Sequence, residues 1–165
     1  MSKQKDHSQY TKQSHNLDIK LLCDNLVSPA NIGGVLRLAD AYGVNEVVFV
    51  SENKEKLSPK VRAVSRGAHN YVKNSFSNDY GVIEDESDRK WFCLEITENS
   101  IPLNHLETIP FKIGIIIGNE SKGIDSELLK HFPSYHLEMF GNNSSMNVSN
   151  SLSAMLFYFT QVIAL

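Results

Sequence analysis

Apolar runs of strand length alternate with helix-like segments along most of this chain, and this alternation constrains the fold more than any other feature. The runs lie at residues 19–23, 46–50, 91–96, 112–117 and 135–139. They are apolar on both sides, whereas a strand with one solvated face alternates apolar and polar residues. Strands of this kind, separated by helices, predict an α/β fold with a mostly parallel sheet and helices on both faces.

The last helix is the clearest of those predicted. Apolar residues recur at intervals of three and four along it: Val148, Leu152, Met155, Phe159 and Val162. Either Asn147 or Ser145 is its expected N-cap. Shorter helices are predicted over residues 31–43, 58–67, 79–88 and 126–131. Gly43 is expected to end the first of these, and Pro59 to open the second.

Composition indicates one globular domain. A chain of 165 residues with 41% hydrophobic residues can bury a core without disulfides. Residues 1–16 are polar and are expected to form a flexible tail, which leaves residues 17–165 as the domain. The sequence has no apolar run of membrane length and no signal-peptide core, so a cytoplasmic location without membrane contact is expected. Cys23 and Cys93 lie inside apolar runs, which predicts buried, reduced thiols.

Charge is unevenly distributed along the chain, although the net charge is only −3. Residues 79–107 carry eight acids and two bases, whereas residues 53–73 carry six bases and one acid. A basic segment can attract phosphate even when the whole chain is mildly acidic. The candidate phosphate-binding residues are Lys54, Lys56, Lys60, Arg62 and Arg66. The alternative is that both segments are ordinary solvated faces.

Three polar loops follow predicted strands. They cover residues 28–34, 118–123 and 139–147, and the last runs directly into the C-terminal helix. In a parallel sheet the ligand crevice lies beyond the carboxyl ends of the strands, so the loops are expected to converge there. They contain no G-x-G-x-x-G pattern and no lysine-serine pair of the P-loop kind, which argues against a dinucleotide or nucleoside-triphosphate site.

No metal site is predicted, because no histidines or cysteines have the spacing of metal ligands. Four histidines are instead expected at the surface or in the core: His69, His105, His131 and His136.

Each of the three loops carries a spaced pattern. The patterns are Asn31-x-Gly33-x-x-x-Arg37-x-Ala39-x-x-x-Gly43, Gly118-Asn-Glu120-x-x-Gly123 and Met139-x-Gly141-x-x-x-Ser145-Met-Asn147-Val-Ser149. In order and spacing they resemble the motifs of the SpoU (TrmH) family of RNA 2′-O-ribose methyltransferases, within the SPOUT superfamily. One motif alone would be a weak signal, but three in register are specific. The resemblance covers residues 19–161.

The resemblance implies a C-terminal deep trefoil knot, a homodimer, and S-adenosylmethionine as the methyl donor, with no metal. The residues expected to contact the donor are Glu95, Ile96, Gly118, Leu137, Met139, Gly141 and Met146. Family members build the active site from both subunits, and Ala154, Phe157 and Tyr158 are expected at the dimer contact. Two positions depart from the family pattern, since Glu138 replaces a proline and Met146 a leucine. The charge of Glu138 is expected to weaken or alter donor binding.

The implied reaction moves a methyl group to a ribose 2′-hydroxyl, which is a poor nucleophile until its proton leaves or its charge is stabilised. The resemblance assigns the catalytic set Arg37, Asn31, Glu120, Ser145 and Asn147. Because a guanidinium is effectively never deprotonated, Arg37 is expected to hold the adjacent phosphate and the forming oxyanion as a cation. Asn31, Glu120 and Ser145 are expected to orient it and the ribose. Asn147 is expected to cap the helix and tie the knot.

The RNA is less closely defined than the reaction. The first motif and the Arg66-Gly-Ala segment are similar to the branch that methylates tRNA guanosines, which favours tRNA over ribosomal RNA, and the basic residues of 53–73 are expected to hold it. Two alternatives stay open: an RNA-binding module that has lost turnover, and a SPOUT enzyme that methylates a base nitrogen. The complete catalytic set argues against the first, and the arginine of the first motif against the second.

Overall fold

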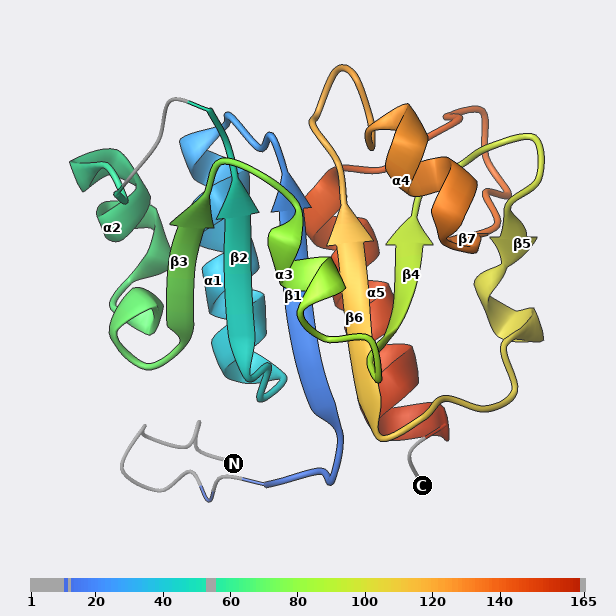
Figure 1. Cartoon of the computed structure of the whole chain (residues 1–165), viewed down its shortest axis with the longest axis horizontal. Coiled ribbons are helices and arrows are strands. Elements are labelled where there is room, and N and C mark those ends of the chain that lie inside the picture. The colour runs from blue at the N-terminus through green and yellow to red at the C-terminus, as the bar shows by residue number, and fades with distance from the viewer. Residues whose placement is uncertain (1–10, 12, 53–55, 164–165) are drawn as a thin grey trace, which may run out of the picture.

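A computed structural model describes residues 11, 13–52 and 56–163, and a single sheet runs through it (Figure 1). Its seven strands are all parallel and lie in the order β3-β2-β1-β6-β4-β7-β5. The strands are β1 (Asp18–Asp24), β2 (Glu46–Val50), β3 (Lys73–Ser77), β4 (Lys90–Leu94), β5 (Ile101–Pro102), β6 (Lys112–Ile117) and β7 (Ser134–His136).

Helices connect most of these strands. The α-helices are α1 (Pro29–Ala41), α2 (Pro59–Ser65), α3 (Gly81–Glu84), α4 (Ser126–His131) and α5 (Val148–Phe157). Two short 3₁₀ helices, η2 (Ala68–Asn70) and η3 (Leu103–His105), follow α2 and β5, and the π-helix η4 (Tyr158–Ile163) follows α5.

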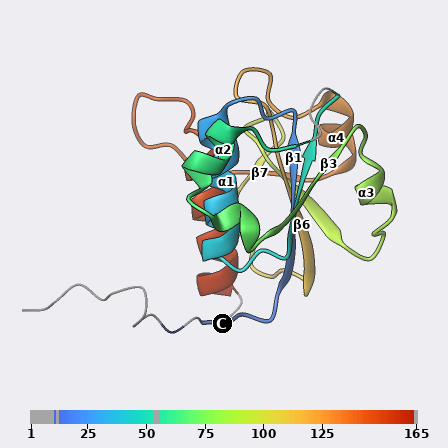
Figure 2. The ribbon, with the colours of Figure 1, turned by 90° about the vertical axis from the view of Figure 1, so that its left-hand side faces the viewer.

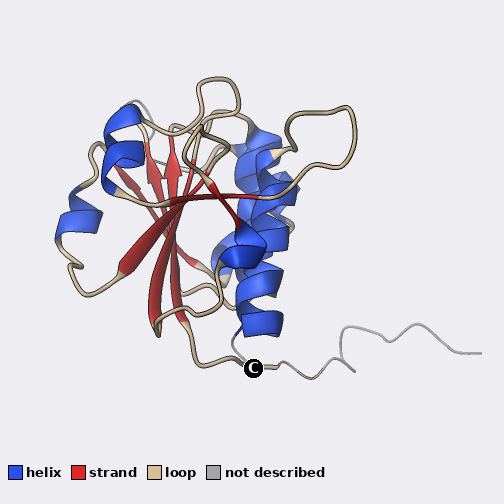
Figure 3. Ribbon diagram, turned by 90° about the vertical axis from the view of Figure 1, so that its right-hand side faces the viewer, coloured by secondary structure: helices blue, strands red, loops and turns tan. Residues whose placement is uncertain are grey.

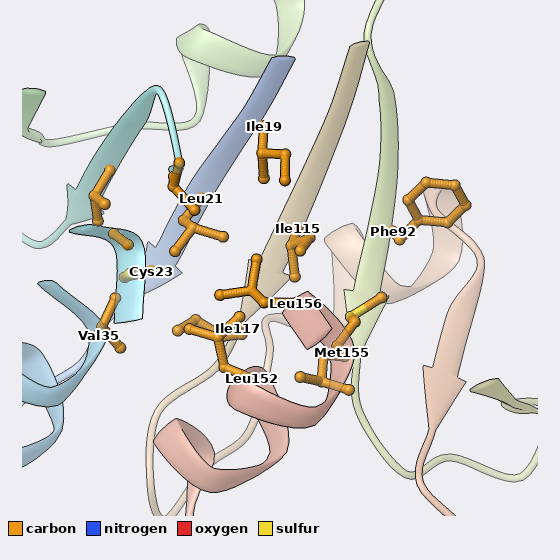
Figure 4. Close-up of a cluster of buried hydrophobic side chains, with 14 of the residues drawn as sticks. Ile19, Leu21, Cys23, Val35, Phe92, Ile115, Ile117, Leu152, Met155 and Leu156 are labelled. Atoms are coloured by element: carbon orange, nitrogen blue, oxygen red, sulfur yellow. The ribbon is translucent and has the colours of Figure 1, made fainter. Parts of the chain in front are cut away.

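The helices cover both faces of the sheet (Figures 2 and 3). α1, α2 and α5 lie on one face, and α3 and α4 on the other. Successive strand residues point to opposite faces, so Leu21 and Ile115 pack with Leu152 of α5 (Figure 4), while their neighbours Leu22 and Ile116 pack under α3 and α4. Two-sided burial explains why the strands are apolar throughout.

Local sequence sets where the helices begin and end. Ser58 caps α2 and Asn147 caps α5, because each side chain accepts a hydrogen bond from a backbone N–H of the first turn. Of the two N-caps expected for α5, Asn147 is therefore the one formed. Gly43 ends α1 with a φ of 63°, a left-handed conformation that glycine adopts without strain.

The predicted parallel sheet with helices on both faces is confirmed, but several boundaries are wrong. The strands predicted over 91–96 and 135–139 end at Leu94 and His136. Of the acidic helix predicted over 79–88, only the single turn of α3 is helical. The helix predicted through Val162 is a regular α-helix only as far as Phe157, and the wider π-helix η4 follows it. β3 and β5 were not predicted, because β3 is a polar edge strand and β5 has two residues.

The predicted tail, residues 1–16, lies mostly outside the described residues. Within it, Nε2 of His15 donates to the carbonyl of Tyr42 at 2.7 Å, at the end of α1. Cys23 and Cys93 are buried free thiols, as predicted, and burial raises the pKa of Cys93 to about 12. Among the described residues, no helix has the length and apolar character that crossing a membrane requires. The trefoil knot stays a prediction.

Charged side chains form a network at the amino ends of the strands. Lys20 is 6% exposed and lies between the carboxylates of Glu46, at 2.9 Å, and Glu86. Arg89 is 8% exposed and donates to Glu86 and, at 3.1 Å, to Asp18. Burial opposes the charges on Lys20 and Arg89, but their hydrogen bonds to carboxylates outweigh it and raise both pKa values. The network therefore consists of mutually satisfied charges.

Candidate functional site

The three polar loops meet at the carboxyl edge of the sheet, and side-chain hydrogen bonds join them. Asn31, which belongs to the first motif and lies in the first turn of α1, donates from Nδ2 to Oε1 of Glu120 in the second loop at 2.8 Å. Its Oδ1 accepts from Nδ2 of Asn147 in the third loop, also at 2.8 Å. Asn147 in turn accepts from the backbone N–H and hydroxyl of Ser149 at the start of α5. These four residues form an amide relay that ties the motifs together through the buried Asn31.

Glu120 is held as a carboxylate by donors from the first loop. The backbone N–H of Ser28 donates to it at 2.9 Å and that of Val27 at 3.3 Å, beside the amide of Asn31. Burial alone would raise the pKa of Glu120, but these hydrogen bonds favour the charged form more strongly and lower the pKa below its usual value. At neutral pH this side chain therefore accepts hydrogen bonds and positions the first loop.

Two glycines let the second loop fold back on itself. A Cβ on Gly118 would lie 2.3 Å from the backbone carbon of Gly123, which no side chain can tolerate. Gly123 has a φ of 72°, and a Cβ on it would lie 2.8 Å from Oε2 of Glu95. That carboxylate also accepts from the backbone N–H of Ile124 at 3.3 Å. The glycines thus bring the loop after β6 against the residue that follows β4.

A small cavity of about 80 Å³ lies at the ends of β4 and β7, and we call it the β4–β7 cavity. Its described lining residues are Leu94, Glu95, Ile96, His136, Leu137, Met139, Ser145, Met146 and Ser151. It therefore brings together five of the seven residues predicted to contact the donor and the predicted catalytic Ser145. Gly118 and Gly141 do not line it, since Gly118 packs against Gly123 and Gly141 lies in open space on the third loop.

The side chains that line this cavity have the polarity and charge that S-adenosylmethionine requires. Leucine and methionine side chains suit its apolar parts, and Glu95, the only acid among the described lining residues, suits its positive sulfonium. Nδ1 of His136 is buried without a hydrogen-bond partner in the described part of the chain, so a bound polar group would satisfy it. Sequence reasoning missed His136, whose only signal was its position just before the third motif.

The cavity is smaller than the roughly 300–1,000 Å³ of small-molecule sites. His136 and Leu137 also line a second, larger hollow, so the two are adjacent. The third loop arches away from the sheet beside the helices (Figures 2 and 3), and most of its residues are exposed. A whole donor molecule therefore requires the cavity to extend into its neighbour or the third loop to move outward.

The larger hollow is a groove of about 610 Å³ along α5, which we call the α5 groove. Ala154, Phe157 and Tyr158, the predicted dimer residues, line it together with Phe140, which is 94% exposed. Glu138 also lines it and accepts weakly from Nδ2 of Asn104 at 3.4 Å. The acid that replaces the family proline therefore faces this groove and is not among the described residues of the β4–β7 cavity.

Arg37 lies on the exposed side of α1. It makes no hydrogen bond or ion pair with any other residue that the structure describes. Nor is it among the described residues that line the β4–β7 cavity. Among the described residues of one chain, the predicted catalytic arginine therefore has no partner and is not part of the cavity lining.

Four of the five predicted phosphate-binding residues lie on α2 or next to it in the sequence. Lys56, Lys60, Arg62 and Arg66 are exposed, while Lys54 lies outside the described residues. No group of three or more His, Cys, Asp or Glu that could hold a metal ion occurs in the part of the chain that the structure describes.

Solved structures share this fold. An AdoMet-bound rRNA methyltransferase from Sinorhizobium meliloti matches with a TM-score of 0.77 at 20% identity, over 85% of this chain and 54% of that one. A structure concerned with the 2-OH methylation of C/U34 on tRNA matches with a TM-score of 0.76 at 19% identity, over 86% of this chain and 93% of that one. The parallel sheet with its joined motif loops is the SPOUT class of fold.

The chain belongs to the SpoU rRNA Methylase family, whose model matches residues 18–157. A Staphylococcus aureus (strain MSSA476) protein named as a TrmH family tRNA/rRNA methyltransferase is 30% identical over 159 residues, which are 92% of this chain and 63% of that protein. The resemblance carried by the three motifs is thereby confirmed. The chain spans about three-fifths of the length of the curated relatives it matches.

Proposed function

We propose that this protein transfers a methyl group from S-adenosylmethionine to a ribose 2′-hydroxyl of RNA. The observation that carries the proposal is the amide relay, which holds the three family motifs at one edge of the sheet beside the β4–β7 cavity. Membership of the SpoU rRNA Methylase family supports methyl transfer to RNA. The neighbouring structure concerned with 2-OH methylation supports the ribose oxygen as the acceptor.

The donor would sit in the β4–β7 cavity and extend toward the α5 groove. When bound, it supplies a methyl group that its sulfonium makes electrophilic. Leu137, Met139 and Met146 would enclose its apolar parts, and Glu95 would face its positive charge. Nδ1 of His136 would gain a hydrogen-bond partner.

The acceptor is the 2′-oxygen of the ribose. As its bond to the methyl carbon forms and the carbon–sulfur bond breaks, the hydroxyl proton passes to solvent. Arg37 would hold the neighbouring phosphate and the developing oxyanion, because a guanidinium offers two parallel donors and keeps its charge. Ser145, at the cavity wall, would orient the ribose hydroxyl.

The complete site would form in a homodimer. Arg37 lies off the cavity of its own chain, so Arg37 of the partner subunit would supply the cation. The α5 groove supports this arrangement, since exposed apolar side chains such as Phe140 and Phe157 favour burial against a second copy. The trefoil knot and a cytoplasmic location belong to the same proposal and stay predictions.

The favoured substrate is tRNA. The Arg66-Gly-Ala segment carries this preference, and the match over 93% of a chain whose structure concerns tRNA supports it. Ribosomal RNA is the second candidate, because the matching family model is described for rRNA.

Methyl transfer from radiolabelled S-adenosylmethionine to unmodified tRNA and to unmodified rRNA tests the proposal. Label is expected in tRNA, in a dinucleotide that resists alkaline hydrolysis because its 2′-oxygen is blocked. Label in a free base would instead identify a base methyltransferase. RNA binding with no transfer would identify a binding module without turnover.

A further inference from the structure

A polar groove of about 350 Å³ lies at the β3 end of the sheet, away from the β4–β7 cavity. We call it the β3 groove. The segment before α2, α2 itself, η2 and β3 all contribute to it, with Lys56, Arg62, His69, Asn74 and Phe76 among the lining residues. The proposed methyl transfer gives no role to His69, Asn74 or Phe76.

The charged residues described in the β3 groove are all basic. Lys56 and Arg62 line it, and none of its described lining residues is acidic. Arg62 donates from Nε and Nη2 to the carbonyl of Leu57, both at 3.2 Å, which fixes its guanidinium beside the groove without neutralising it. A ligand that carries phosphate matches this charge.

A buried hydroxyl holds His69 in one orientation. Nδ1 of His69 lies 2.7 Å from Oγ of Ser65, which is fully buried and donates to the carbonyl of Arg62 at 3.0 Å. Because a hydroxyl has a single proton, Nδ1–H donates to Oγ in this arrangement, and Nε2 of the neutral ring keeps its lone pair. Nε2 has no partner among the described residues, so it is available to a ligand.

Asn74 and Phe76 add an acceptor and an aromatic ring. Asn74 donates from Nδ2 to the carbonyls of His69 at 3.0 Å and Val72 at 2.8 Å, and no residue that the structure describes donates to its Oδ1. The ring of Phe76 stacks on that of Phe49 with centroids 5.3 Å apart, so it is held rigidly. Cations, base-edge hydrogen-bonding groups and a rigid ring together are what single-stranded RNA sites use.

We propose that the β3 groove binds an unpaired nucleotide of the RNA substrate, other than the nucleotide that is methylated. The inference rests on the proposed function, which makes RNA the substrate. β3 and β4 are four positions apart in the sheet order, so at about 4.8 Å per strand the groove lies roughly 19 Å across the sheet from the cavity of the same chain. That span exceeds one nucleotide step, so the groove recognises a flanking segment and contributes to the choice of RNA.

Two variants test the proposal by different physical effects. Phe76→Leu keeps an apolar side chain but removes the ring, and Lys56→Gln removes one exposed cation. Affinity for a labelled pool of unmodified tRNA transcripts is measured by fluorescence anisotropy, without the methyl donor, over a range of salt. Phe76→Leu should weaken binding about tenfold. Lys56→Gln should weaken binding and reduce the slope of log affinity against log salt by about 0.7–0.9.

Lys130→Gln is the matched control, because Lys130 is an exposed lysine of α4 on the opposite face of the sheet, and its tRNA affinity should equal that of the unchanged protein. Thermal unfolding shows whether Phe76→Leu is folded. If that variant does not fold, Lys56→Gln still tests the proposal, because a substitution at this exposed position should leave the fold intact. Affinity unchanged in Lys56→Gln and in folded Phe76→Leu overturns the proposal. Competition by uridine monophosphate as strong as that by tRNA also overturns it, because the ligand would then be a free nucleotide.

The two proposals fail in different ways. If the unchanged protein methylates RNA while both variants bind RNA normally, the groove assignment alone is wrong. If the unchanged protein binds tRNA through the groove but transfers no methyl group, the proposed activity alone is wrong. Ultraviolet crosslinking to tRNA that contains 4-thiouridine should label the peptide with residues 69–76, in addition to any label at the methylation site, and absence of label from this peptide would contradict the groove assignment.

Discussion

The amino and carboxyl edges of the sheet differ in the polar side chains that they bury. At the amino edge, Lys20 and Arg89 are buried, and carboxylates of the same chain neutralise both. At the carboxyl edge, the buried polar groups are the amide of Asn31 and the carboxylate of Asp24, which accepts from the hydroxyl of Tyr80 and the backbone N–H of Asp125 and has no cation as a partner among the described residues. The cation nearest in sequence to that amide, Arg37, is exposed and has no partner among the described residues.

This difference separates charges that serve the fold from charges that serve a ligand. A buried cation with its own carboxylates has no donor to spare, and removing it leaves a buried charge uncompensated. A guanidinium without a carboxylate partner can bind an anion without first breaking an internal pair. Substitution of a buried, paired cation should therefore change stability, and substitution of the unpaired Arg37 should change activity.

The largest expected effect is that of Arg89→Ala on stability. Its loss leaves Asp18 without a cation and Glu86 with Lys20 alone among the described residues, and removing one member of a buried ionic group costs about 3–5 kcal/mol. Urea unfolding followed by circular dichroism measures the change. Lys130→Ala, which breaks only the exposed pair with Glu127, is the control and should leave the midpoint unchanged. A similar small effect of both variants would mean that the amino edge is not structural.

Arg37→Ala should reduce the methyl-transfer rate by about 10²–10³-fold, the effect of removing one oxyanion donor. The urea midpoint should stay unchanged, because Arg37 has no internal partner among the described residues. Arg37→Lys keeps the charge but loses the paired donors, so its rate should remain well below that of the unchanged protein at saturating donor. A lysine variant of near-normal rate would contradict the two-donor role.

The same distinction explains what the sequence could predict. A strand that is buried on both faces has a continuous apolar run, which predicts the strand from the sequence. In β1, for example, Leu21 and Leu22 pack on opposite faces of the sheet. β3 is an edge strand whose Lys73-Asn-Ser-Phe-Ser sequence lacks such a run, so its place follows only from pairing with β2. The burial of Arg89 could not be predicted from the sequence either, because it depends on a carboxylate 71 residues away in the chain.

The candidate site shows the same limit. The three motifs predicted which loops would converge, and the relay through Asn31 bears this out. The motifs did not predict that Glu138 faces the α5 groove or that His136 has a buried, unpartnered nitrogen, because both depend on where the chain turns after β7. His69 and Asn74 carry no motif at all, and tertiary packing alone makes them neighbours.

Asn31→Ala should show how much the neutral amide hydrogen bonds of the relay contribute to the free energy of unfolding. Glu120 and Asn147 each lose a partner, so the free energy of unfolding should fall by about 1–3 kcal/mol. Asn147→Ala alone and the double variant complete a cycle, and the double change should cost less than the sum of the single changes, because both remove one shared hydrogen bond. Strict additivity would mean that the two amides are not coupled.

Acid should weaken both edges. Glu86 and Glu120 have pKa values below the usual one, in both cases because hydrogen bonds outweigh burial. Their stabilisation is therefore present above about pH 4.3, the usual pKa of glutamate, and is lost as the pH falls through the lower folded-state value. Urea midpoints between about pH 6 and pH 3 should fall less steeply for Glu86→Gln and for Glu120→Gln than for the unchanged protein. Unchanged slopes would show that neither carboxylate is linked to folding.

The smallest expected effect is that of Glu138→Pro, which restores the residue typical of the family, on donor affinity. An acid inside the β4–β7 cavity would interact with the bound sulfonium, but Glu138 faces the α5 groove. The calorimetric dissociation constant for S-adenosylmethionine should therefore change by less than about 0.5 kcal/mol, roughly twofold. Glu95→Gln is the matched change inside the cavity and should weaken binding more. If Glu138→Pro has the larger effect, the donor reaches further into the α5 groove than the cavity walls imply.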